Sequence, residues 1–442
     1  MGNKVTKIVW IVNIAMADAC IALGKPAPVI GGWLTGYQDA LLTAYPEVEL
    51  HIVEPYWGAK PRQITTTWTK GDAPAATITH HLFPDAWLSA EAKQTGPMQS
   101  RLSAFSNLMV SHFAELAEEI QPDAVHLHGT ELPHAWAWIE ANGTAHTIAS
   151  IQGLACEYAK VFMSGLTPQQ QRRSFSDWRH GFSLANDQAQ LAERGKKEVA
   201  LLQKIEHVAG RTQWDHDCAL HINDRLHYFT LQEVLRQEFY DKAGSWDYTK
   251  CRPHTLFVSQ SHYPIKGLHQ LLKALPLVLT QYPDLQVRIV GHDISHKHWW
   301  QRSSYGNVLH DLIEQNGLRS HLCFLGPLTA PQMVDEYLGA NLFVCPSRIE
   351  NSCNSVCEAQ LLGTPVIAAR VGGMDTLIEH QQTGLLYDFT DTASLAESIC
   401  RLFADADACG NISAQASDAA QQRHNRSDIA HTLYNIYKEL SL

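Results

Sequence analysis

Residues 342–365 read LFVCPSRIENSCNSVCEAQLLGTP, and their pattern is the strongest indication of the architecture of this chain. They begin with an apolar run, Leu342–Cys345, that has the composition of a buried strand. A polar loop follows, and Val356–Leu362 continues as a helix that ends before Gly363 and Pro365. A strand that passes through a loop into a helix is the building unit of parallel sheets, which bind ligands at the carboxyl ends of their strands.

The same pattern recurs along the rest of the chain. Short β-branched runs alternate with longer helical patterns such as Gln99–Ile120, which predicts an α/β protein with parallel sheets. Because the alternation occurs twice, we expect two doubly wound, Rossmann-like domains with a ligand cleft between them. The expected strands are Lys7–Asn13, Val48–Val53, Ala124–His128 and Thr147–Gln152 in the first series, and Thr255–Ser259, Leu285–Gly291, His321–Leu325, Asn341–Cys345 and Pro365–Ala369 in the second.

The alternation is interrupted once, by a non-periodic stretch rich in aromatic and charged residues. We therefore expect a first domain over residues 1–225, a linker over 226–252 and a second domain over 253–425. A last helix in residues 426–442 is expected to pack back on the first domain. The apolar run 8–12 follows two lysines, but it is short, and we interpret it as a buried strand rather than a signal peptide.

Composition excludes several classes of protein. The chain has 442 residues, with 34 Lys and Arg against 45 Asp and Glu, so its net charge is −11. A nucleic-acid-binding domain should be basic, and we therefore expect no nucleic-acid partner. Ten scattered cysteines are too few for a disulfide scaffold and suit a reducing cytosol, so we expect a cytoplasmic protein. No apolar run reaches the length of about 18 residues that a transmembrane helix needs.

The loop after the strand Leu342–Cys345 has the chemistry of an anion site. Ser352, Asn354 and Ser355 are residue types that favour a helix N-terminus, where free amides and the helix dipole attract phosphate. Glu350 lies in the loop and Glu358 about one turn inside the helix. These two carboxylates can bind hydroxyl groups at the two ends of one elongated ligand.

Three other short motifs follow predicted strands. Lys266 and Gly267 stand at a helix entrance, where a lysine beside a glycine can reach a phosphate with little hindrance. Adjacent glycines, Gly31 and Gly32, allow backbone amides to approach a ligand closely, although a plain tight turn would also explain them. His128 ends a strand, and strand alternation places it on the same side as His126; a structural role for both stays open.

The segment Glu350–Glu358, together with VGGMD at 371–375 and TGLL at 383–386, resembles a known motif. It is similar to the glutamate-x7-glutamate motif of retaining nucleotide-sugar glycosyltransferases of the GT-B fold, in glycosyltransferase family 4. The resemblance implies that Glu350 faces the donor sugar and that Glu358 binds the ribose. It implies the catalytic residues Glu350, His128 and Lys266, and the donor-binding residues Gly31, Gly32, Gln260, Lys266, Gly326, Leu328, Asn351, Ser352, Cys353, Asn354, Ser355 and Glu358.

The chain departs from the family at one position. The family has an arginine four or five residues before the Lys-Gly pair, and this chain has Gln260 or Ser261 there. One cation at the diphosphate is then missing unless another basic residue, such as Arg348, replaces it. The turn at 324–328 resembles the base-contacting turn of the family, which is the reason for including Gly326 and Leu328.

We expect no metal site and no cofactor, with a nucleotide sugar as the donor substrate. Cys345, Cys353 and Cys357 lack the paired spacing of zinc ligands. Asp215 and Asp217 imitate an Asp-x-Asp metal motif, but they lack its context, and we interpret them as a cap or a surface cluster.

The implied function is transfer of a sugar, with retention, from a UDP- or GDP-sugar to a glycan or lipid-linked glycan in cell-surface polysaccharide synthesis. Two alternatives stay open, a nucleotide-sugar 2-epimerase of similar fold and a non-catalytic protein that binds sugar nucleotides. A dinucleotide oxidoreductase is disfavoured, because no Gly-x-Gly-x-x-Gly follows a strand.

A basic and partly aromatic region lies within residues 169–197. Such a region can dock on an anionic membrane, and lipid-linked acceptors in the family favour that interpretation. A solvated helix face explains the same composition, so peripheral membrane contact is one of two interpretations.

Overall fold

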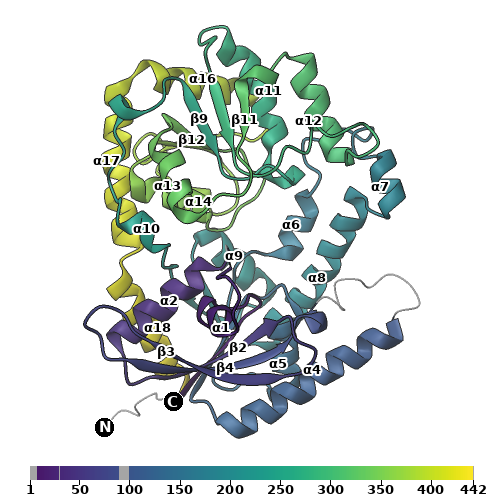
Figure 1. Cartoon of the computed structure of the whole chain (residues 1–442), viewed down its shortest axis with the longest axis vertical. Helices are drawn as coiled ribbons and strands as arrows, with labels where there is room; N and C mark the ends of the chain where they lie inside the picture. The colour runs from purple at the N-terminus through teal and green to yellow at the C-terminus, as the bar shows by residue number, and fades with distance from the viewer. Residues whose placement is uncertain (1–6, 29, 89–98, 442) are drawn as a thin grey trace. The chain divides into compact units, whose positions relative to one another are not determined.

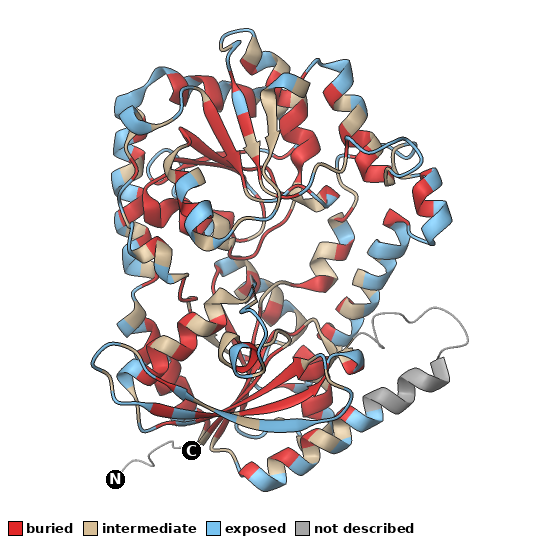
Figure 2. Cartoon of the chain, viewed as in Figure 1, coloured by how far each residue is buried: buried red, intermediate tan, exposed pale blue. Residues whose placement is uncertain are grey.

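The computed structural model describes residues 7–28, 30–88 and 99–441, except for the side chains of residues 99–106. The chain divides into two compact units (Figure 1). Unit 1 comprises Met1–Cys156, Glu193–Val234 and His424–Leu442, and unit 2 comprises Glu157–Ala192 and Leu235–Arg423. Each unit is built around one sheet whose central strands are buried, whereas the outer faces of the helices are exposed (Figure 2). Across the described residues, no helix combines the length and the apolar character needed to span a bilayer.

Unit 1 contains an eight-stranded sheet in the order β3-β4-β2-β1-β5-β6-β7-β8. All neighbouring strands are parallel except β3 and β4. The strands are β1 (Lys7–Ile11), β2 (Glu49–Tyr56), β3 (Arg62–Trp68), β4 (Ala76–Pro84), β5 (Ala124–His128), β6 (Thr147–Ser150), β7 (His207–Gly210) and β8 (His227–Thr230). Its helices are α1 (Ala17–Ala22), α2 (Gly32–Ala44), α4 (Gln99–Ile120), α5 (Pro133–Asn142), α9 (Gln213–Ile222) and α18 (Arg426–Leu440).

Unit 2 contains a six-stranded parallel sheet in the order β11-β10-β9-β12-β13-β14. The strands are β9 (Thr255–Val258), β10 (Gln286–Ile289), β11 (Leu322–Phe324), β12 (Leu342–Cys345), β13 (Val366–Ala369) and β14 (Leu385–Tyr387). Its α-helices are α7 (Phe175–His180), α10 (Gln237–Tyr240), α11 (Leu268–Leu279), α12 (Ser304–Gln315), α13 (Ala330–Leu338), α14 (Asn354–Leu362), α15 (Met374–Leu377), α16 (Thr392–Ala404) and α17 (Ala406–Arg423). Three 3₁₀ turns are η1 (Tyr248–Lys250), η2 (Pro264–Lys266) and η3 (Arg319–His321), and helices α6 (Ala155–Val161) and α8 (Leu184–Lys204) contribute residues to both units.

Every strand expected from the sequence is present, within a few residues of its predicted bounds. The prediction missed β3, β4, β7, β8 and β14. β3 is a half-exposed edge strand that pairs antiparallel with β4, and β4 contains two buried histidines, so neither resembles a short run of β-branched residues.

The predicted domain boundaries need two corrections. Residues 157–192 were expected in the first domain but belong to unit 2, because Phe162, Leu166 and Leu184 are buried in the core of that unit. The predicted linker 226–252 is also structured. Its first part contains β8, which pairs with β7 in unit 1, and the remainder packs in unit 2, where the Trp246 indole donates a hydrogen bond to the Ala340 carbonyl (2.8 Å).

The strand orders place a ligand-binding edge in each sheet. In unit 2 the chain runs outward from β9 to β10 and β11, and then reverses to place β12 on the other side of β9. In unit 1 the same reversal occurs at β1, which lies between β2 and β5. In open α/β sheets, the crevice at the carboxyl ends of the strands beside such a reversal is where ligands bind.

Helix α18 packs on unit 1 through the hydroxyl group of Tyr437. The Trp10 indole donates to the Tyr437 oxygen (2.8 Å), and this hydroxyl lies 2.8 Å from Nδ1 of His126. Because the Tyr437 oxygen already accepts from Trp10, its own proton is available for His126, whose Nε2 contacts Ser150 Oγ (2.6 Å). All three aromatic side chains are fully buried, so the network joins the C-terminal helix to two central strands.

We expect Tyr437→Phe to destabilise unit 1 by about 1–3 kcal/mol, because the change leaves a buried indole N–H and a buried imidazole without their partner. Chemical denaturation followed by circular dichroism measures the difference. Tyr434→Phe on the same helix is the matched control, since the Tyr434 hydroxyl makes no hydrogen bond with another described residue. Equal stability of the two variants would contradict the assignment of this network.

Candidate functional site

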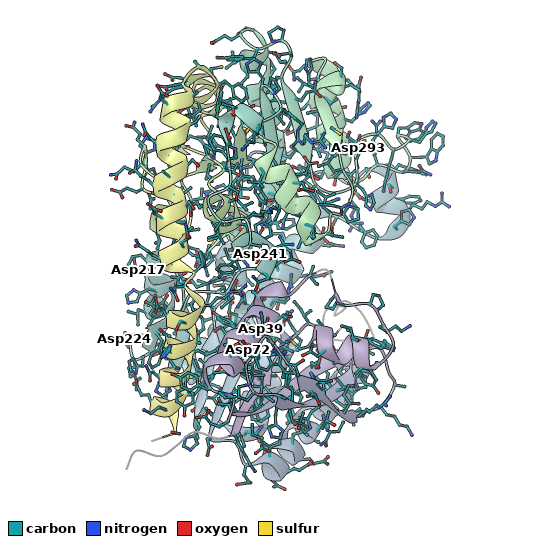
Figure 3. The ribbon with its side chains drawn as sticks, turned by 60° about the vertical axis from the view of Figure 1, so that its left-hand side comes forward. Asp39, Asp72, Asp217, Asp224, Asp241 and Asp293 are labelled. Atoms are coloured by element: carbon teal, nitrogen blue, oxygen red, sulfur yellow. The ribbon has the colours of Figure 1, made fainter. Side chains whose placement is uncertain are left out.

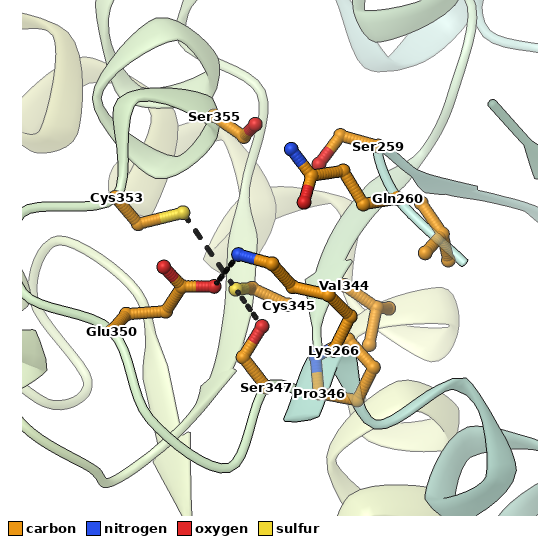
Figure 4. Close-up of a pocket in the computed structure, with 11 residues that line it drawn as sticks. Ser259, Gln260, Lys266, Val344, Cys345, Pro346, Ser347, Glu350, Cys353 and Ser355 are labelled. Carbon is orange, nitrogen blue, oxygen red and sulfur yellow. Dashed lines mark hydrogen bonds and ion pairs between the residues drawn. The ribbon is translucent and has the colours of Figure 1, made fainter. Parts of the chain in front are cut away.

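An ion pair lies at the reversal point of the sheet in unit 2. Nζ of Lys266 donates to Oε1 of Glu350 at 2.7 Å, and only 20% of the lysine side chain and 9% of the glutamate side chain are exposed. Lys266 ends the turn η2 after β9, and Glu350 lies in the loop after β12. Ser259, Gln260 and other residues of these loops line a small cavity beside the pair (Figure 4).

The two loops approach each other closely because Gly267 follows Lys266. Gly267 has a φ of 71°, and a Cβ atom at this position would lie 1.7 Å from the carbonyl oxygen of Pro346. The backbone N–H of Arg348 donates to the carbonyl of Ile265 (2.7 Å), which ties the loops together. A glycine is therefore required here both by the left-handed backbone and by the contact.

The loop that carries Glu350 is held from its other side by a second glycine. A Cβ atom on Gly372, whose φ is 51°, would lie 2.0 Å from the Glu350 carbonyl oxygen. That carbonyl accepts a hydrogen bond from the N–H of Gly373 (3.0 Å). The Gly-Gly pair of the VGGMD segment thus supports the backbone of Glu350, which gives a physical role to a motif first noted in the sequence.

Electrostatics keep the ammonium group of Lys266 charged. Burial by itself lowers the pKa of this lysine, but the adjacent Glu350 carboxylate outweighs it and raises the pKa above its usual value. A charged ammonium beside a cavity is suited to bind an anion, and the Glu350 carboxylate retains an oxygen that can accept hydrogen bonds from a hydroxylated ligand.

The helix α14 starts directly beside this pair. Its first residue is Asn354, and Cys353 is the N-cap, whereas the sequence pointed to Ser352, Asn354 or Ser355 at this end. The Cys353 side chain makes no capping hydrogen bond. Cys353 and Ser355 line the same cavity as Lys266, so the positive end of the helix dipole adds to the attraction for an anion.

Tyr158 belongs to this site, and the sequence analysis missed it. Its hydroxyl accepts a hydrogen bond from the N–H of Asn351 (3.1 Å). Burial first, and then the nearby Glu350 carboxylate, raise the pKa of this tyrosine, so it stays a neutral phenol. Tyr158 lies on α6 in the part of the chain that the prediction assigned to the other domain, and no local motif marks it.

Glu358 lies on α14 but already has a cationic partner. Its partner is Arg236, a residue of the segment that the sequence predicted as a linker. Nε of Arg236 donates a hydrogen bond to Oε1 of Glu358 (2.9 Å), and Nη2 of Arg236 lies 2.7 Å from the same oxygen. Burial raises the pKa of Glu358 to about 7, and Arg236 acts in the opposite direction. The Arg236 guanidinium also lies over the Phe239 ring, 4.7 Å from its centre. Any ribose bound by Glu358 would therefore share this carboxylate with Arg236.

The residues that stand where the family has an arginine occupy different places. Gln260 lines the cavity, as Figure 4 shows, whereas Ser261 is fully buried and its hydroxyl lies 3.4 Å from the carbonyl of Val290. Arg348 does not line the cavity, and its guanidinium lies over the ring of Phe389 at 5.5 Å. The structure thus gives no support to Arg348 as the replacement cation.

In the predicted base-contacting turn, the backbone N–H and carbonyl groups of Gly326 already form hydrogen bonds within the protein. The N–H of Gly291 donates to the carbonyl of Gly326 (2.9 Å), and the N–H of Gly326 donates back (3.2 Å). Leu328 packs against the core of unit 2. Gly326 thus offers at most one carbonyl lone pair to a ligand.

Gly31 and Gly32 form the start of α2 in unit 1. Gly31 is the N-cap residue with a φ of 81°, and a Cβ atom on it would lie 3.2 Å from the Ile14 side chain. These glycines place Trp33 and Tyr37 of α2 around the imidazole of His128, with ring centres at 5.5 and 6.1 Å.

His128 and His126 lie on the same side of β5, as strand alternation predicts, and their rings stack at 3.9 Å. His128 is fully buried, and neither of its ring nitrogens has a hydrogen-bond partner among the described residues. Burial lowers its pKa well below the usual value, so the ring is neutral. Trp33 and Tyr37 of α2 therefore lie close to an imidazole that has no exposed surface.

A pair of buried carboxylates lies beyond His128 in unit 1. Glu198 accepts from the Thr130 hydroxyl (2.7 Å) and from the N–H of Cys156 (3.1 Å), and burial raises its pKa to about 7. Burial also raises the pKa of Glu131, whose Oε2 has no partner among the described residues. These two acids provide acceptor atoms for hydroxyl groups.

The cysteines around the site form a cluster with the carboxylate of Glu350. Cys345 and Cys353 approach to 3.9 Å between sulfur atoms and, with Glu350, present ligand atoms within 4.8 Å of one another, whereas Cys357 is not part of this set. The Lys266 ammonium on Glu350 makes a second cation at this place unfavourable.

Asp215 caps α9, as one of the two interpretations of its motif predicts. It accepts from the N–H of Thr212 (3.1 Å) in a capping box. Asp217 is exposed at the surface of unit 1 (Figure 3).

Comparison with known proteins finds a family model that matches part of the second unit. Residues 249–422 match the family model described as Glycosyl transferases group 1. A protein from Pseudarthrobacter chlorophenolicus named D-inositol 3-phosphate glycosyltransferase is 28% identical over 293 residues, which cover 64% of this chain and 63% of the relative. The chain spans less than two thirds of the length of this relative, and only 41% of a protein of the same name from Corynebacterium urealyticum, at 29% identity over 40% of this chain.

Solved structures show the fold over the whole chain. Sucrose-phosphate synthase from Thermosynechococcus elongatus aligns with a TM-score of 0.66 at 16% identity, covering 98% of this chain and 99% of that protein. Anabaena Alr3699/HepE in complex with UDP and glucose aligns with a TM-score of 0.58 at 16% identity, over 97% and 98% of the two chains. The expected GT-B architecture of two parallel-sheet α/β domains is thereby confirmed.

We expect Gly267→Ala to destabilise unit 2 by about 2 kcal/mol or more, because the new methyl group would both strain the backbone and collide with the Pro346 carbonyl. Gly317→Ala is the matched control, since Gly317 has a similar φ of 64° but nothing within 4 Å of the added Cβ. Thermal unfolding compares the two variants. An equal loss of stability in both would show that the loops can separate without cost.

Proposed function

We propose that this chain, whose residues 249–422 match the family model described as Glycosyl transferases group 1, is a retaining glycosyltransferase that uses a nucleotide diphosphate sugar. The observation that carries the proposal is the Lys266–Glu350 pair at the carboxyl ends of β9 and β12, beside the start of α14. It combines a cation and a helix dipole for a diphosphate with a carboxylate for sugar hydroxyls.

The donor is a UDP- or GDP-sugar, and UDP is favoured because structures of the same fold were solved with it. In the proposed complex the diphosphate lies between Lys266 and the backbone of Asn351–Ser355. The negative charge that grows on the leaving diphosphate is stabilised there, and one preorganised donor of this kind contributes roughly 3–4 kcal/mol. No metal ion is required in this scheme, because the ammonium and the helix dipole provide the positive charge.

Glu350 positions the sugar through its hydroxyl groups. The bond between the anomeric carbon and the phosphate oxygen breaks, and the acceptor oxygen forms the new bond from the same face, so the configuration is retained. The proton of the acceptor hydroxyl passes to the departing phosphate oxygen. His128 remains a proposed catalytic residue of unit 1, and Gly31 and Gly32 remain proposed donor contacts.

The acceptor is proposed to be a glycan or a lipid-linked glycan of cell-surface polysaccharide synthesis, in the cytoplasm. The hydrogen-bond acceptors Glu131 and Glu198 in unit 1 support a hydroxylated acceptor. A screen of nucleotides and nucleotide sugars by thermal shift is the first experiment, because a ligand that binds the folded state raises its melting temperature. Analysis of products formed from the donor alone then separates transfer from 2-epimerisation.

Glu350→Gln should reduce sugar transfer by about 100-fold or more while nucleotide binding persists, because the neutral amide removes charge beside the reacting sugar. Transfer assays and circular dichroism on the same preparation measure the effect, since the change also leaves Lys266 without its counter-ion. Glu397→Gln on the exposed face of α16 is the control. Near-normal turnover of a folded Glu350→Gln protein would remove Glu350 from the catalytic set.

Lys266→Met should weaken binding of UDP by about tenfold or more, because it removes the charge that faces the diphosphate. Lys266→Arg retains the charge and should bind UDP more tightly than the Met variant. Isothermal titration calorimetry measures both. Lys250→Met is the control, because the side chain of Lys250 is 77% exposed. An unchanged dissociation constant for Lys266→Met would exclude the lysine from the donor site.

A further inference from the structure

Four large aromatic side chains form a continuous exposed surface on unit 2. They come from α7 and from the loop before α12, and we call them the aromatic patch: Phe175, Trp178, Trp299 and Trp300, which are 46%, 68%, 58% and 38% exposed. Phe175 contacts both Trp178 (6.0 Å between ring centres) and Trp299 (5.7 Å), and Trp299 contacts Trp300 (5.7 Å). Contiguous exposed aromatic surface of this kind marks an interaction site.

The patch is held in place by a buried carboxylate. Asp177 on α7 accepts hydrogen bonds from the N–H of Ser174 (3.2 Å) and from the N–H of Ser304 (2.8 Å), which begins α12. This single side chain therefore links the two segments, and α7 lies beside α12 in Figure 1. The aromatic rings are consequently presented together by a fixed scaffold rather than by two independent loops.

Cations surround the patch. Arg172, Arg173 and Arg179 are exposed next to or on α7, and Lys297 is exposed on the other segment. Besides the buried Asp177, three acidic residues lie in the same region. Asp293 (Figure 3) is paired with Arg319 at 2.9 Å, whereas Asp187 and Asp311 are exposed. The local balance of these exposed groups is positive in a chain whose net charge is −11.

A polar cavity adjoins the patch. Arg172, Arg173 and Ser174 line it together with Ser304, Asn307 and Asp311 of α12. Two guanidinium groups outweigh the single Asp311 carboxylate there, and with the hydroxyl and amide groups they match the hydrogen-bonding requirements of a phosphate. The surface thus combines a site for an anionic head group with rings that can enter an apolar layer.

We propose that unit 2 docks on the surface of an anionic membrane through the aromatic patch, with Arg172 and Arg173 contacting lipid phosphate. Tryptophan concentrates at the interface between lipid and water, and basic residues near it are attracted to anionic lipids. The positive surroundings distinguish this partner from a neutral glycan. The proposal rests on the surface alone and is independent of the proposed transferase activity.

The structure changes the surface that the sequence suggested. Arg194, Lys196 and Lys197, which belonged to the basic region of residues 169–197, are part of unit 1. Trp299 and Trp300, more than a hundred residues away in the chain, join the patch instead. Phe182, 63% exposed, follows α7 and adds apolar area close to it.

The test is co-sedimentation of the full chain with extruded vesicles. One set contains phosphatidylcholine alone, and the other contains about one third phosphatidylglycerol. We expect binding to the anionic vesicles that falls with added salt, and a loss of about tenfold in vesicle affinity for the double variant Trp178→Ala and Trp299→Ala. The pair Arg172→Gln and Arg173→Gln should also lose affinity and show a weaker dependence on salt.

Trp57→Ala is the matched control, because Trp57 is a 47% exposed tryptophan of unit 1 and should leave vesicle binding unchanged. All substituted side chains are exposed, and circular dichroism verifies that the variants are folded. Absence of wild-type binding to anionic vesicles, or unchanged binding by the double tryptophan variant, would overturn the proposal. Equal binding to neutral vesicles, or binding to a neutral polysaccharide in place of vesicles, would overturn it as well.

Discussion

The buried pair of Lys266 and Glu350 is the interaction on which the site depends. Removing two charges from water is costly, and the cost is offset only when the charges are close and well oriented. Here the ammonium and the carboxylate are 2.7 Å apart, a separation that two backbone contacts maintain. One is the approach of Gly267 to the loop after β12, and the other is the support of the Glu350 carbonyl by Gly372 and Gly373. These glycines therefore determine the distance between the two charges as well as the course of the backbone.

The sheet of unit 2 explains why this pair lies where it does. The reversal of strand order between β9 and β12 leaves the two following loops side by side, without a helix between them. A cation from one loop and an acid from the other can then meet at the edge where α14 directs its positive end. Tyr158 and Arg236 complete the surroundings from segments outside this sheet, and both engage the loop or helix that carries the two glutamates.

Unit 1 repeats the topology with a different chemistry. Its reversal point presents neutral histidines surrounded by aromatic rings, together with buried carboxylates whose pKa values are raised by burial. Such a site offers hydrogen-bond acceptors rather than positive charge. The contrast supports the proposed division of labour, in which unit 2 binds an anionic donor and unit 1 binds a hydroxylated acceptor.

Local patterns in the sequence are sufficient to predict the elements that bury an apolar run. All the expected strands and the helix Gln99–Ile120 belong to this class, because burial and backbone conformation depend mainly on neighbouring residues. The position of residues 157–192, the pairing of Arg236 with Glu358 and the assembly of the aromatic patch were decided by packing between distant segments. The residues that make these contacts follow no periodic pattern in the sequence. Arg236 and Phe175, for example, each contact a partner more than a hundred residues away, and only the folded chain brings such partners within contact distance.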